Sequence, residues 1–434
     1  MKNGNLSSPF RMFMDVDKKA IELSRKRKGK ITISSKLKKG EMDLSLVYTP
    51  GVAAVAMAIK KNEEDEKNLT YSGNSIAVIT DGTRVLGLGN IGPHAAMPVM
   101  EGKALLFKYY GGVDAVPITL GVTDKEKIID AVKAIAPSFS GINLEDIEFP
   151  KAYYILRELK ESLRIPIWHD DEQGTAAVST AGLLNAFRLL KKDIKNSKIV
   201  VFGVGAANSM TIMFLQKLGV NAENIIAIDS NGPLYKGRED MEEIKSKNPV
   251  KYEITNATNK EQEKTIEGAF KDADAVVAAS KPGPGVIKGE WIRKMNEPIV
   301  FALANPYPEI GRKEALAAGA KVYCSGRSDL PNQINNSLVF PGMFRGALDS
   351  HSKAITDNMA IAAAKELAQY ALKKGLKKDY IIPRMDDVEV HCRVAAAVAY
   401  SAVKEGIASR KSTYSRFYRE AKEKILEAQR RMFI

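Results

Sequence analysis

A short apolar run that leads through glycines into a helical segment is the feature that most narrows the fold of this chain. Residues 198–202 (KIVVF) are rich in β-branched side chains, and Gly203 and Gly205 follow before an apolar helical segment. The first glycine permits a tight turn, and the second lets the backbone approach a pyrophosphate at the start of the helix. Asp229 ends the next apolar run, where an acid binds the hydroxyls of an adenine ribose. This context predicts a dinucleotide-binding α/β domain.

Two properties of this segment stay open in the sequence. Asn208 occupies the third fingerprint position, where Gly or Ala is usual, so either helix and strand lie further apart or Asn208 contacts the phosphate. The carboxylate of Asp229 favours NAD because it repels a 2′-phosphate, whereas Lys236 and Arg238 would offset that repulsion for NADP. The alternative is a domain that packs tightly at its glycines and binds nothing. The predicted cofactor-binding residues here are Gly203, Gly205, Ala206, Ala207, Asn208 and Asp229.

Further strands and helices alternate along the chain. Strand-like runs at 74–82, 115–121 and 165–169 are separated by helical segments. Five more such runs follow, at 198–202, 224–232, 272–280, 298–306 and 321–326. Such alternation is typical of an α/β fold with mostly parallel sheets, and 434 residues suit two domains. We expect an N-terminal substrate- and metal-binding α/β domain (1–180), a doubly wound Rossmann-type NAD(P)-binding domain (181–345) and C-terminal helices that pack back on the catalytic core (346–434).

Composition and charge argue against several classes of protein. The two cysteines, Cys324 and Cys392, cannot form a disulfide framework, and no apolar run approaches the ~20 residues that a bilayer span needs. The N-terminus lacks the apolar core of a secretory signal, so we expect a cytoplasmic protein without membrane partners. The formal charge of +13 includes a basic run at 24–39, but no nucleic-acid motif accompanies it. Such a run is typical of a solvated surface, and its field would also attract a dianionic substrate.

Two acidic pairs follow apolar runs. Glu145 and Asp146 lie in the segment GINLEDI, and Asp170 and Asp171 follow the run IPIWH. Because ligand sites in parallel sheets lie beyond the carboxyl ends of the strands, the two pairs are expected to converge. Several carboxylate oxygens together suit Mg²⁺ or Mn²⁺, and a divalent ion would remove their mutual repulsion. The alternative is that these acids cap the helices that follow them.

Several separate motifs resemble those of malic enzymes. The matching segments are 47–52 (VYTPGV), 81–107 (DGTRVLGLGNIGPHAAMPVMEGKALLF), GINLEDI, HDDEQGTAAV, 301–309 (FALANPYPE) and 326–349. They stand in the family's order from about residue 20 to about residue 405, and the length is similar to that of the small bacterial and archaeal members. The resemblance implies oxidative decarboxylation of L-malate to pyruvate and CO₂ with reduction of NAD(P)⁺. It also implies dependence on Mg²⁺ or Mn²⁺ and a homo-oligomer, a dimer or a dimer of dimers.

The resemblance also implies catalytic and metal-binding roles. Tyr48 corresponds to the general acid, Lys103 to the general base, and Asp170 to an acid that orients this lysine. The residues that correspond to metal ligands are Glu145, Asp146 and Asp171. A lysine can act as a base only if burial or a nearby cation lowers its pKa, and a divalent ion would be such a cation. Whether Tyr48 and Lys103 serve the site of their own subunit or of a partner stays open.

Three further residues correspond to substrate ligands. Arg84 matches a carboxylate-binding arginine, whose guanidinium can grip a carboxylate bidentately. Asn305 and Asn336 match substrate-contacting asparagines, and Asn305 is also expected beside the cofactor. His94 and His169 receive no role.

Two other functions compete with this interpretation. A malolactic enzyme would have similar residues but would keep NAD bound and release lactate. A non-catalytic Rossmann protein that binds nucleic acid is a second alternative, motivated by the positive charge and by Asn208. The retention of Tyr48, Lys103 and the four acids favours an enzyme.

Overall fold

Two largely parallel sheets organise the chain in the computed structural model, which describes residues 8–85 and 87–432. The first sheet has the order β2-β1-β3-β4, and all its strands are parallel. Its strands are β1 (Ser75–Thr80), β2 (Asp114–Thr119), β3 (Ile142–Leu144) and β4 (Ile167–His169). Alternate residues of β1 enter different apolar clusters, with Ile76 and Val78 on one face and Ala77 and Ile79 on the other. Burial on both faces explains why the central residues of β1 form a continuous apolar run.

Helices cover both faces of this sheet. Helices α6 (Lys125–Ile135) and α7 (Lys151–Ser162) supply the cluster that contains Ala77 and Ile79. Helix α5 (Gly92–Gly111) lies on the opposite face with Met100 and Phe107. The long apolar helix α8 (Thr175–Leu189) then leads into the second sheet, and its core residues belong to the same cluster as α5.

The second sheet has the order β10-β9-β8-β5-β6-β7, with only β7 antiparallel among its strands. Its strands are β5 (Ile199–Phe202), β6 (Ile225–Asp229), β7 (Gly232–Pro233), β8 (Ala275–Ala278), β9 (Ile299–Ala302) and β10 (Val322–Ser325). Its helices are α9 (Ala206–Lys217), α10 (Met241–Lys247), α11 (Pro249–Ala257), α12 (Ile266–Phe270), α13 (Gly289–Ile292) and α14 (Arg312–Ala317). Strand β5 pairs with β6 on one side and β8 on the other, which is the switch point where doubly wound sheets bind nucleotides.

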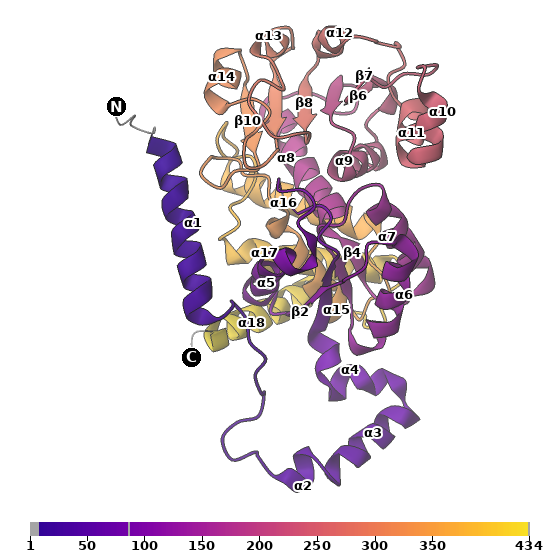
Figure 1. Cartoon of the computed structure of the whole chain (residues 1–434), viewed down its shortest axis with the longest axis vertical. Helices are drawn as coiled ribbons and strands as arrows, with labels where there is room; N and C mark the ends of the chain where they lie inside the picture. The colour runs from indigo at the N-terminus through magenta and orange to yellow at the C-terminus, as the bar shows by residue number, and fades with distance from the viewer. Residues whose placement is uncertain (1–7, 86, 433–434) are drawn as a thin grey trace.

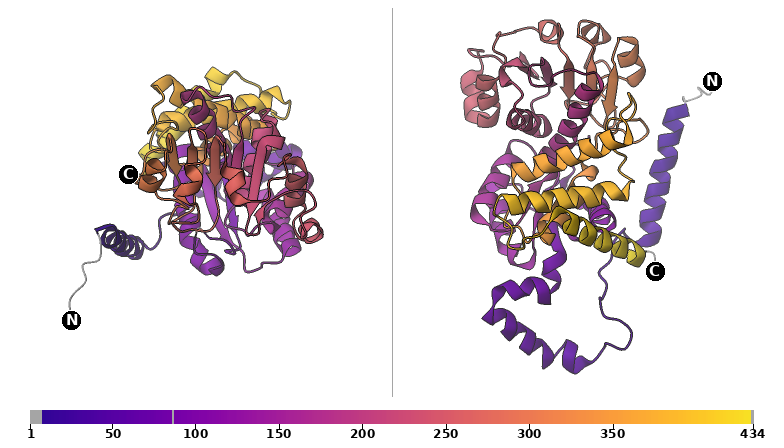
Figure 2. Two further views of the ribbon diagram at one scale, coloured as in Figure 1. Left: turned by 90° about the horizontal axis from the view of Figure 1, so that it is seen from above. Right: turned by 180° about the vertical axis from the view of Figure 1, so that it is seen from behind.

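The C-terminal helices pack beside the first sheet (Figure 2). They are α15 (Phe340–Asp349), α16 (Asp357–Lys374), α17 (Val388–Lys404) and α18 (Tyr414–Met432). Phe340 and Phe344 of α15 contact the ring of Phe107 on α5 at centroid distances of 4.6 and 5.4 Å. A Cβ on Gly346 would lie 2.3 Å from the carbonyl oxygen of Ala395, so glycine allows α15 and α17 to approach closely. The expectation that these helices pack near the predicted catalytic core is consistent with these contacts.

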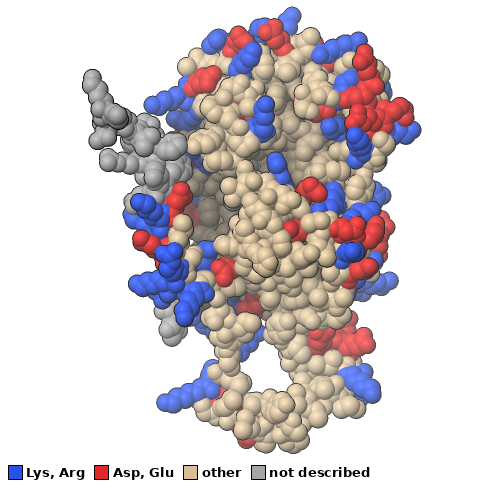
Figure 3. Space-filling model, in the orientation of Figure 1, with Lys and Arg blue, Asp and Glu red and all other residues tan. Residues whose placement is uncertain are grey.

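The N-terminal segment forms an arm that extends away from both sheets (Figures 1 and 2). It contains α1 (Ser8–Arg27), α2 (Leu44–Val47), α3 (Gly51–Lys61) and α4 (Glu66–Leu69). No residue of α2, α3 or α4 is buried, although α3 is rich in apolar side chains. Figure 3 shows an open hole between this arm and the body of the protein.

The α/β fold with a Rossmann-type sheet and a helical C-terminal segment is confirmed. The eight predicted strands correspond to β1, β2, β4, β5, β6, β8, β9 and β10. Strands β3 and β7, of three and two residues, are not among the predicted strands. The boundaries at residues 180 and 345 stay a prediction. No helix in the described part of the chain has the length and apolarity that crossing a bilayer requires.

Candidate active site

Strands β3 and β4 bring the two acidic pairs together. The strands are parallel neighbours, and each ends directly before its acids. Oxygen atoms of Glu145, Asp146 and Asp171 lie within 4.8 Å of one another. The backbone N–H of Asp146 donates to Oδ2 of Asp171 at 2.8 Å, which ties the two strand ends to each other. The predicted convergence is confirmed, and this set of hard oxygen donors fits a divalent cation such as Mg²⁺ or Mn²⁺.

The acids do not cap the helices that follow them. Helix α7 begins after Pro150 and α8 after Gly174, and neither N-cap residue makes a side-chain hydrogen bond. A single π-helical turn (Asp170–Gly174) separates β4 from α8, and it also begins without a side-chain cap. The capping alternative is therefore wrong for these helices. The reason is that the strands end so close together that the carboxylates face one another instead of the next helix.

Lys103 projects from the middle of α5 into the acidic cluster. Its Nζ lies 2.6 Å from Oδ2 of Asp170 and 2.8 Å from Oε1 of Glu145. It also lies 4.2 Å from the centre of the Phe340 ring, which shields one side of the ammonium. Phe107, one helical turn further along α5, packs on that same ring. The aromatic packing of α5 on α15 therefore fixes where the ammonium lies.

Both carboxylate oxygens of Asp170 accept hydrogen bonds. Oδ1 accepts a hydrogen bond from Nε1 of Trp168 at 3.0 Å, and Oδ2 accepts from Lys103. A Cβ on Gly174 would lie 2.0 Å from Oδ1 of Asp170, so the π-helical turn closes over the carboxylate only because residue 174 is glycine. Burial raises the pKa of Asp170 while the Lys103 ammonium opposes that rise. This geometry suits the predicted role of Asp170 as the residue that orients Lys103.

The pKa values in the cluster reflect burial and crowding. Burial alone would lower the pKa of Lys103, but the charges of Asp170, Glu145 and Asp171 hold it above its ordinary value. Burial raises the pKa of Glu145 well above its usual range, against the effect of Lys103. A lysine that acts as a general base needs a lowered pKa instead. The protein groups alone do not supply that shift, whereas a cation held by the carboxylates would offset the negative charge that raises the lysine pKa.

The predicted substrate ligands lie around this cluster. The backbone N–H of Arg84 donates to the carbonyl oxygen of Asp146 at 3.0 Å, and the Arg84 side chain is exposed. A Cβ on Gly174 would lie 3.0 Å from Cβ of Asn336, which places Asn336 beside the π-helical turn. Asn305 is exposed and follows β9, so it belongs to the other sheet. A Cβ on Gly87 would lie 2.4 Å from the Asn305 carbonyl oxygen, so the loop after Arg84 reaches across to it.

Tyr48 lies apart from the other predicted catalytic residues. It is the C-cap of α2 on the N-terminal arm, and the residue is 69% exposed. Among the described residues, no hydrogen bond connects its hydroxyl to Lys103 or to the acids. Figure 1 shows α2 at the bottom of the view, where the arm lies furthest from both sheets. One subunit therefore does not assemble all of the predicted catalytic residues.

The glycine turn after β5 fits a bound dinucleotide phosphate. Gly203 has φ +91°, and a Cβ there would lie 2.7 Å from the carbonyl oxygen of Ala279, so only glycine suits this turn. A Cβ on Gly205 would meet no atom within 4 Å, and the N-cap of α9 makes no side-chain hydrogen bond. The N-terminus of α9, with Ala206 and Ala207, is therefore open to an anion.

Asn208 has a structural role that the sequence did not suggest. Its side-chain amide donates to the carbonyl oxygens of Phe202, Gly203 and Val277 at 3.1, 2.9 and 3.2 Å. The side chain is buried and connects the start of α9 to β5 and β8. The side chain is larger than the usual Gly or Ala, and its amide uses that length to link the ends of β5 and β8 through hydrogen bonds. A contact of Asn208 with the cofactor stays a prediction.

Sequence reasoning missed several residues that position the site. Lys151 donates to Oδ2 of the buried Asp81 at 2.6 Å and so holds the loop that carries Arg84. Glu309 accepts from the backbone N–H groups of Ser280 and Ala304 at 2.7 and 3.1 Å, which joins the loops after β8 and β9. Glu309 lies inside a motif quoted above and Trp168 inside the run IPIWH, but neither pattern reveals which atoms a side chain reaches.

Comparison with known proteins matches both halves of the chain. The family model "Malic enzyme, N-terminal domain" matches residues 26–128, and "Malic enzyme, NAD binding domain" matches residues 172–403. The bifunctional malic/malolactic enzyme of Bacillus subtilis is 43% identical over 398 residues, which are 91% of this chain and 95% of that protein. The NAD-dependent malic enzyme of Geobacillus stearothermophilus is 47% identical over 383 residues, 88% of this chain and 78% of that protein.

Solved structures agree with the sequence comparison. The crystal structure of the Entamoeba histolytica malic enzyme superposes with a TM-score of 0.94 at 41% identity, covering 99% of this chain and 91% of that one. Because two domain models and full-length relatives agree, the chain belongs to the malic enzyme family and catalyses the oxidative decarboxylation of malate with NAD(P)⁺.

Proposed function

We propose that Mg²⁺ or Mn²⁺, held by Glu145, Asp146 and Asp171, serves this reaction, and that L-malate binds beside it. The observation that carries the proposal is the convergence of these three carboxylates within 4.8 Å, next to the buried Lys103. When bound, the metal would polarise the oxygen at C2 of the substrate, and NAD(P)⁺ would supply the acceptor for the hydride from C2.

Lys103 removes the proton from the C2 hydroxyl in this proposal. Its Nζ is held by Asp170 and Glu145 at the edge of the metal ligands, so a hydroxyl bound there is within its reach. Asp170 acts as a positioning residue, because Trp168 holds its other oxygen and prevents the carboxylate from turning away. After CO₂ leaves, the enolate of pyruvate needs a proton at C3, and the phenol of Tyr48 is the proposed donor.

Arg84, Asn305 and Asn336 bind the substrate in this proposal. Arg84 is supported by its backbone link to Asp146, which fixes the start of its loop beside a metal ligand. Asn336 is supported by its position beside the π-helical turn of Asp170. Asn305 is placed by β9 of the nucleotide-binding sheet, so it can contact substrate and cofactor from the opposite side. Guanidinium and amide groups together match the two carboxylates and the hydroxyl of malate.

A homodimer completes the proposed site. Helix α3 exposes Val52, Val55 and Met57, and α2 exposes Leu44 and Leu46. Exposed apolar side chains on adjoining helices are typical of a protein interface. If the arm docks on a second copy of this chain, Tyr48 reaches the Lys103 of that copy. This arrangement explains why Tyr48 lies apart from the acids of its own subunit.

Product analysis tests the proposed function. The purified protein is mixed with L-malate and Mn²⁺, once with NAD⁺ and once with NADP⁺, and reduced nicotinamide, pyruvate and lactate are measured together. Pyruvate that accumulates with equal amounts of reduced cofactor is the expected result. Loss of activity on chelation and recovery with Mn²⁺ or Mg²⁺ would support the metal site, and activity that resists chelation would refute it.

Malolactic chemistry is a second candidate function. It is favoured by the name of the Bacillus subtilis relative, a bifunctional malic/malolactic enzyme. The same mixture distinguishes the two activities, because malolactic turnover gives lactate without net reduced cofactor.

A further inference from the structure

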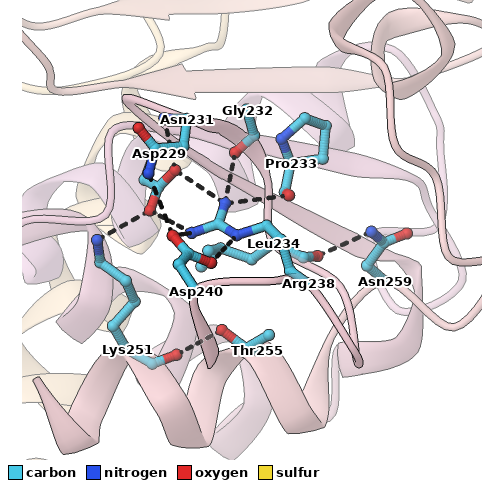
Figure 4. Close-up of polar contacts among 10 residues, drawn as sticks. All are labelled: Asp229, Asn231, Gly232, Pro233, Leu234, Arg238, Asp240, Lys251, Thr255 and Asn259. Atoms are coloured by element: carbon cyan, nitrogen blue, oxygen red, sulfur yellow. Dashed lines mark hydrogen bonds and ion pairs between the residues drawn. The ribbon is translucent and has the colours of Figure 1, made fainter. Parts of the chain in front are cut away.

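The carboxylate of Asp229 has no acceptor site left for a ribose hydroxyl. Oδ1 accepts from Nη1 of Arg238 and from the backbone N–H of Asn231, both at 2.9 Å. Oδ2 accepts from Nη2 of Arg238 at 2.8 Å and from Nζ of Lys251 at 2.9 Å (Figure 4). An ionised carboxylate offers about four lone-pair sites, so these four donors saturate it. Two ribose hydroxyls could bind Asp229 only by displacing protein donors.

Arg238 is the rigid member of this cluster. Its guanidinium also donates to both oxygens of Asp240, at 2.6 and 2.9 Å, and to the carbonyl oxygens of Gly232 and Pro233. Burial would raise the pKa of Asp229, but hydrogen bonds from Arg238 and Lys251 lower it to about 2. Asp229 is thus ionised at any working pH, and its charge is bound to a guanidinium that has no freedom to move away.

The charges in the cluster around Asp229 balance. Arg238 and Lys251 carry two positive charges, and Asp229 and Asp240 carry two negative charges. An unpaired acid at the end of the second Rossmann strand repels a 2′-phosphate, but a neutralised one does so much less. This cluster adjoins the glycine turn, because the backbone N–H of Gly203 donates to the carbonyl oxygen of Ile228, the residue before Asp229, at 2.7 Å. An adenosine 2′-position is therefore expected to lie within reach of the cluster.

Lys251 is the member that can turn toward a ligand. Its side chain is 21% exposed, against 8% for Arg238 and 7% for Asp229. Its backbone is fixed in the first turn of α11, where the side chain of Asn248 accepts from the Lys251 N–H. The only described partner of its ammonium is Asp229, which retains three other donors when Lys251 moves. A lysine ammonium on a flexible stem suits a phosphate as a mobile point charge.

We propose that Lys251 binds the 2′-phosphate of NADP⁺ and that Asp229 positions Arg238 and Lys251 instead of accepting ribose hydroxyls. The chain then accepts NADP⁺ although an acid ends β6. The inference rests on the NAD(P)⁺ binding that the family establishes. It adds the residue that contacts the 2′-phosphate and so distinguishes NADP⁺ from NAD⁺.

Calorimetric titration of adenosine fragments tests this proposal without turnover. Adenosine 2′,5′-bisphosphate and 5′-AMP are titrated into the wild type and into Lys251→Met and Lys251→Arg at one fixed ionic strength. We expect the wild type to bind the bisphosphate more tightly than 5′-AMP. Lys251→Met should weaken bisphosphate binding by about tenfold, as expected for one charge-assisted hydrogen bond, while 5′-AMP binding stays unchanged. Lys251→Arg should retain most of the preference.

Lys247→Met is the matched control, because Lys247 lies on the neighbouring helix α10 and pairs only with Glu243 among the described residues. It should leave both affinities unchanged, and thermal unfolding should show that every variant is folded. Equal affinity of the wild type for the two fragments would overturn the proposal, whatever the variants do. An equal loss for both fragments in Lys251→Met would overturn it as well. Neither result depends on malate turnover, so the proposed function is tested separately.

Discussion

Nζ of Lys103 and Oδ2 of Asp170 lie 2.6 Å apart, with both side chains buried. The lysine comes from the middle of α5 and the aspartate from the turn after β4, so this contact joins two elements that are distant in the chain. Trp168 holds the aspartate, and Phe340 covers the lysine. The pair places a titratable nitrogen beside three carboxylates, and this arrangement leads to the first two predictions.

Replacing Lys103 should separate catalysis from metal binding. Lys103→Met should lower kcat by about 10²- to 10⁴-fold, the usual contribution of a general base. The same variant should bind Mn²⁺ at least as tightly as the wild type, because a positive charge 2.8 Å from Glu145 is removed. Lys108→Met is the control, since Lys108 lies on the same helix but pairs with Asp114 away from the acids. A normal kcat in Lys103→Met would remove the base assignment.

Replacing Asp171 should have the complementary effect. Asp171→Asn keeps the size of the side chain but removes one charge from the ligand set, so Mn²⁺ affinity should fall by at least about tenfold. Titration of Mn²⁺ followed by electron paramagnetic resonance measures the free ion directly. Glu148→Gln removes the same charge from an exposed residue near the cluster and should leave the affinity nearly unchanged. An unaltered Mn²⁺ titration in Asp171→Asn would contradict the ligand assignment.

Mixed dimers should reveal whether the site is shared. Tyr48→Phe and Lys103→Met are each expected to be inactive. If Tyr48 serves its partner's Lys103, each mixed dimer has one intact site, and random mixing restores about a quarter of wild-type activity. The two variants are unfolded together, refolded and assayed, with each variant refolded alone as the control. If Tyr48 serves its own subunit, mixing restores nothing, because every site lacks one of the two residues.

Acid should destabilise the protein through His391. Burial lowers the pKa of His391 to about 4 from its ordinary value of 6.5, and the ring stacks on Tyr110 at 4.3 Å. The unfolded chain binds the proton more readily, so stability is full above pH 6.5 and is lost as the pH falls toward 4. The loss from this group between pH 7.5 and pH 5 is about 2 kcal/mol.

Urea denaturation of the wild type and of His391→Gln at both pH values measures this effect. The variant should be less stable at pH 7.5, since it loses the ring contact with Tyr110, but its denaturation midpoint should depend less on pH. His94→Gln serves as a control because His94 is an exposed histidine. The same pH dependence in His391→Gln and in the wild type would show that another group causes the acid sensitivity.

The sequence alone determined the order of most strands and helices and the chemical character of the site. The four central residues of β1 (76–79) are all apolar because both faces of the strand are buried, and this property is visible in the sequence. The glycine turn after β5 and the acids after β4 follow strands directly, so their positions are local properties as well. Parallel strands end at one edge, and for that reason the convergence of Glu145 with Asp171 could be predicted before any contact was known.

The tertiary structure alone decided which atoms meet. Lys103 and Asp170 are 67 residues apart, and their contact depends on how α5 packs on α15. Asn208 looked like a defect in a phosphate turn, but its amide donates to carbonyl oxygens of β5, of the glycine turn and of β8. Asp229 looked like a free ribose acceptor, but donors from α11 and from the loop before α10 saturate it. Hydrogen-bond partners depend on the packing of distant elements, which local periodicity and motif spacing do not encode.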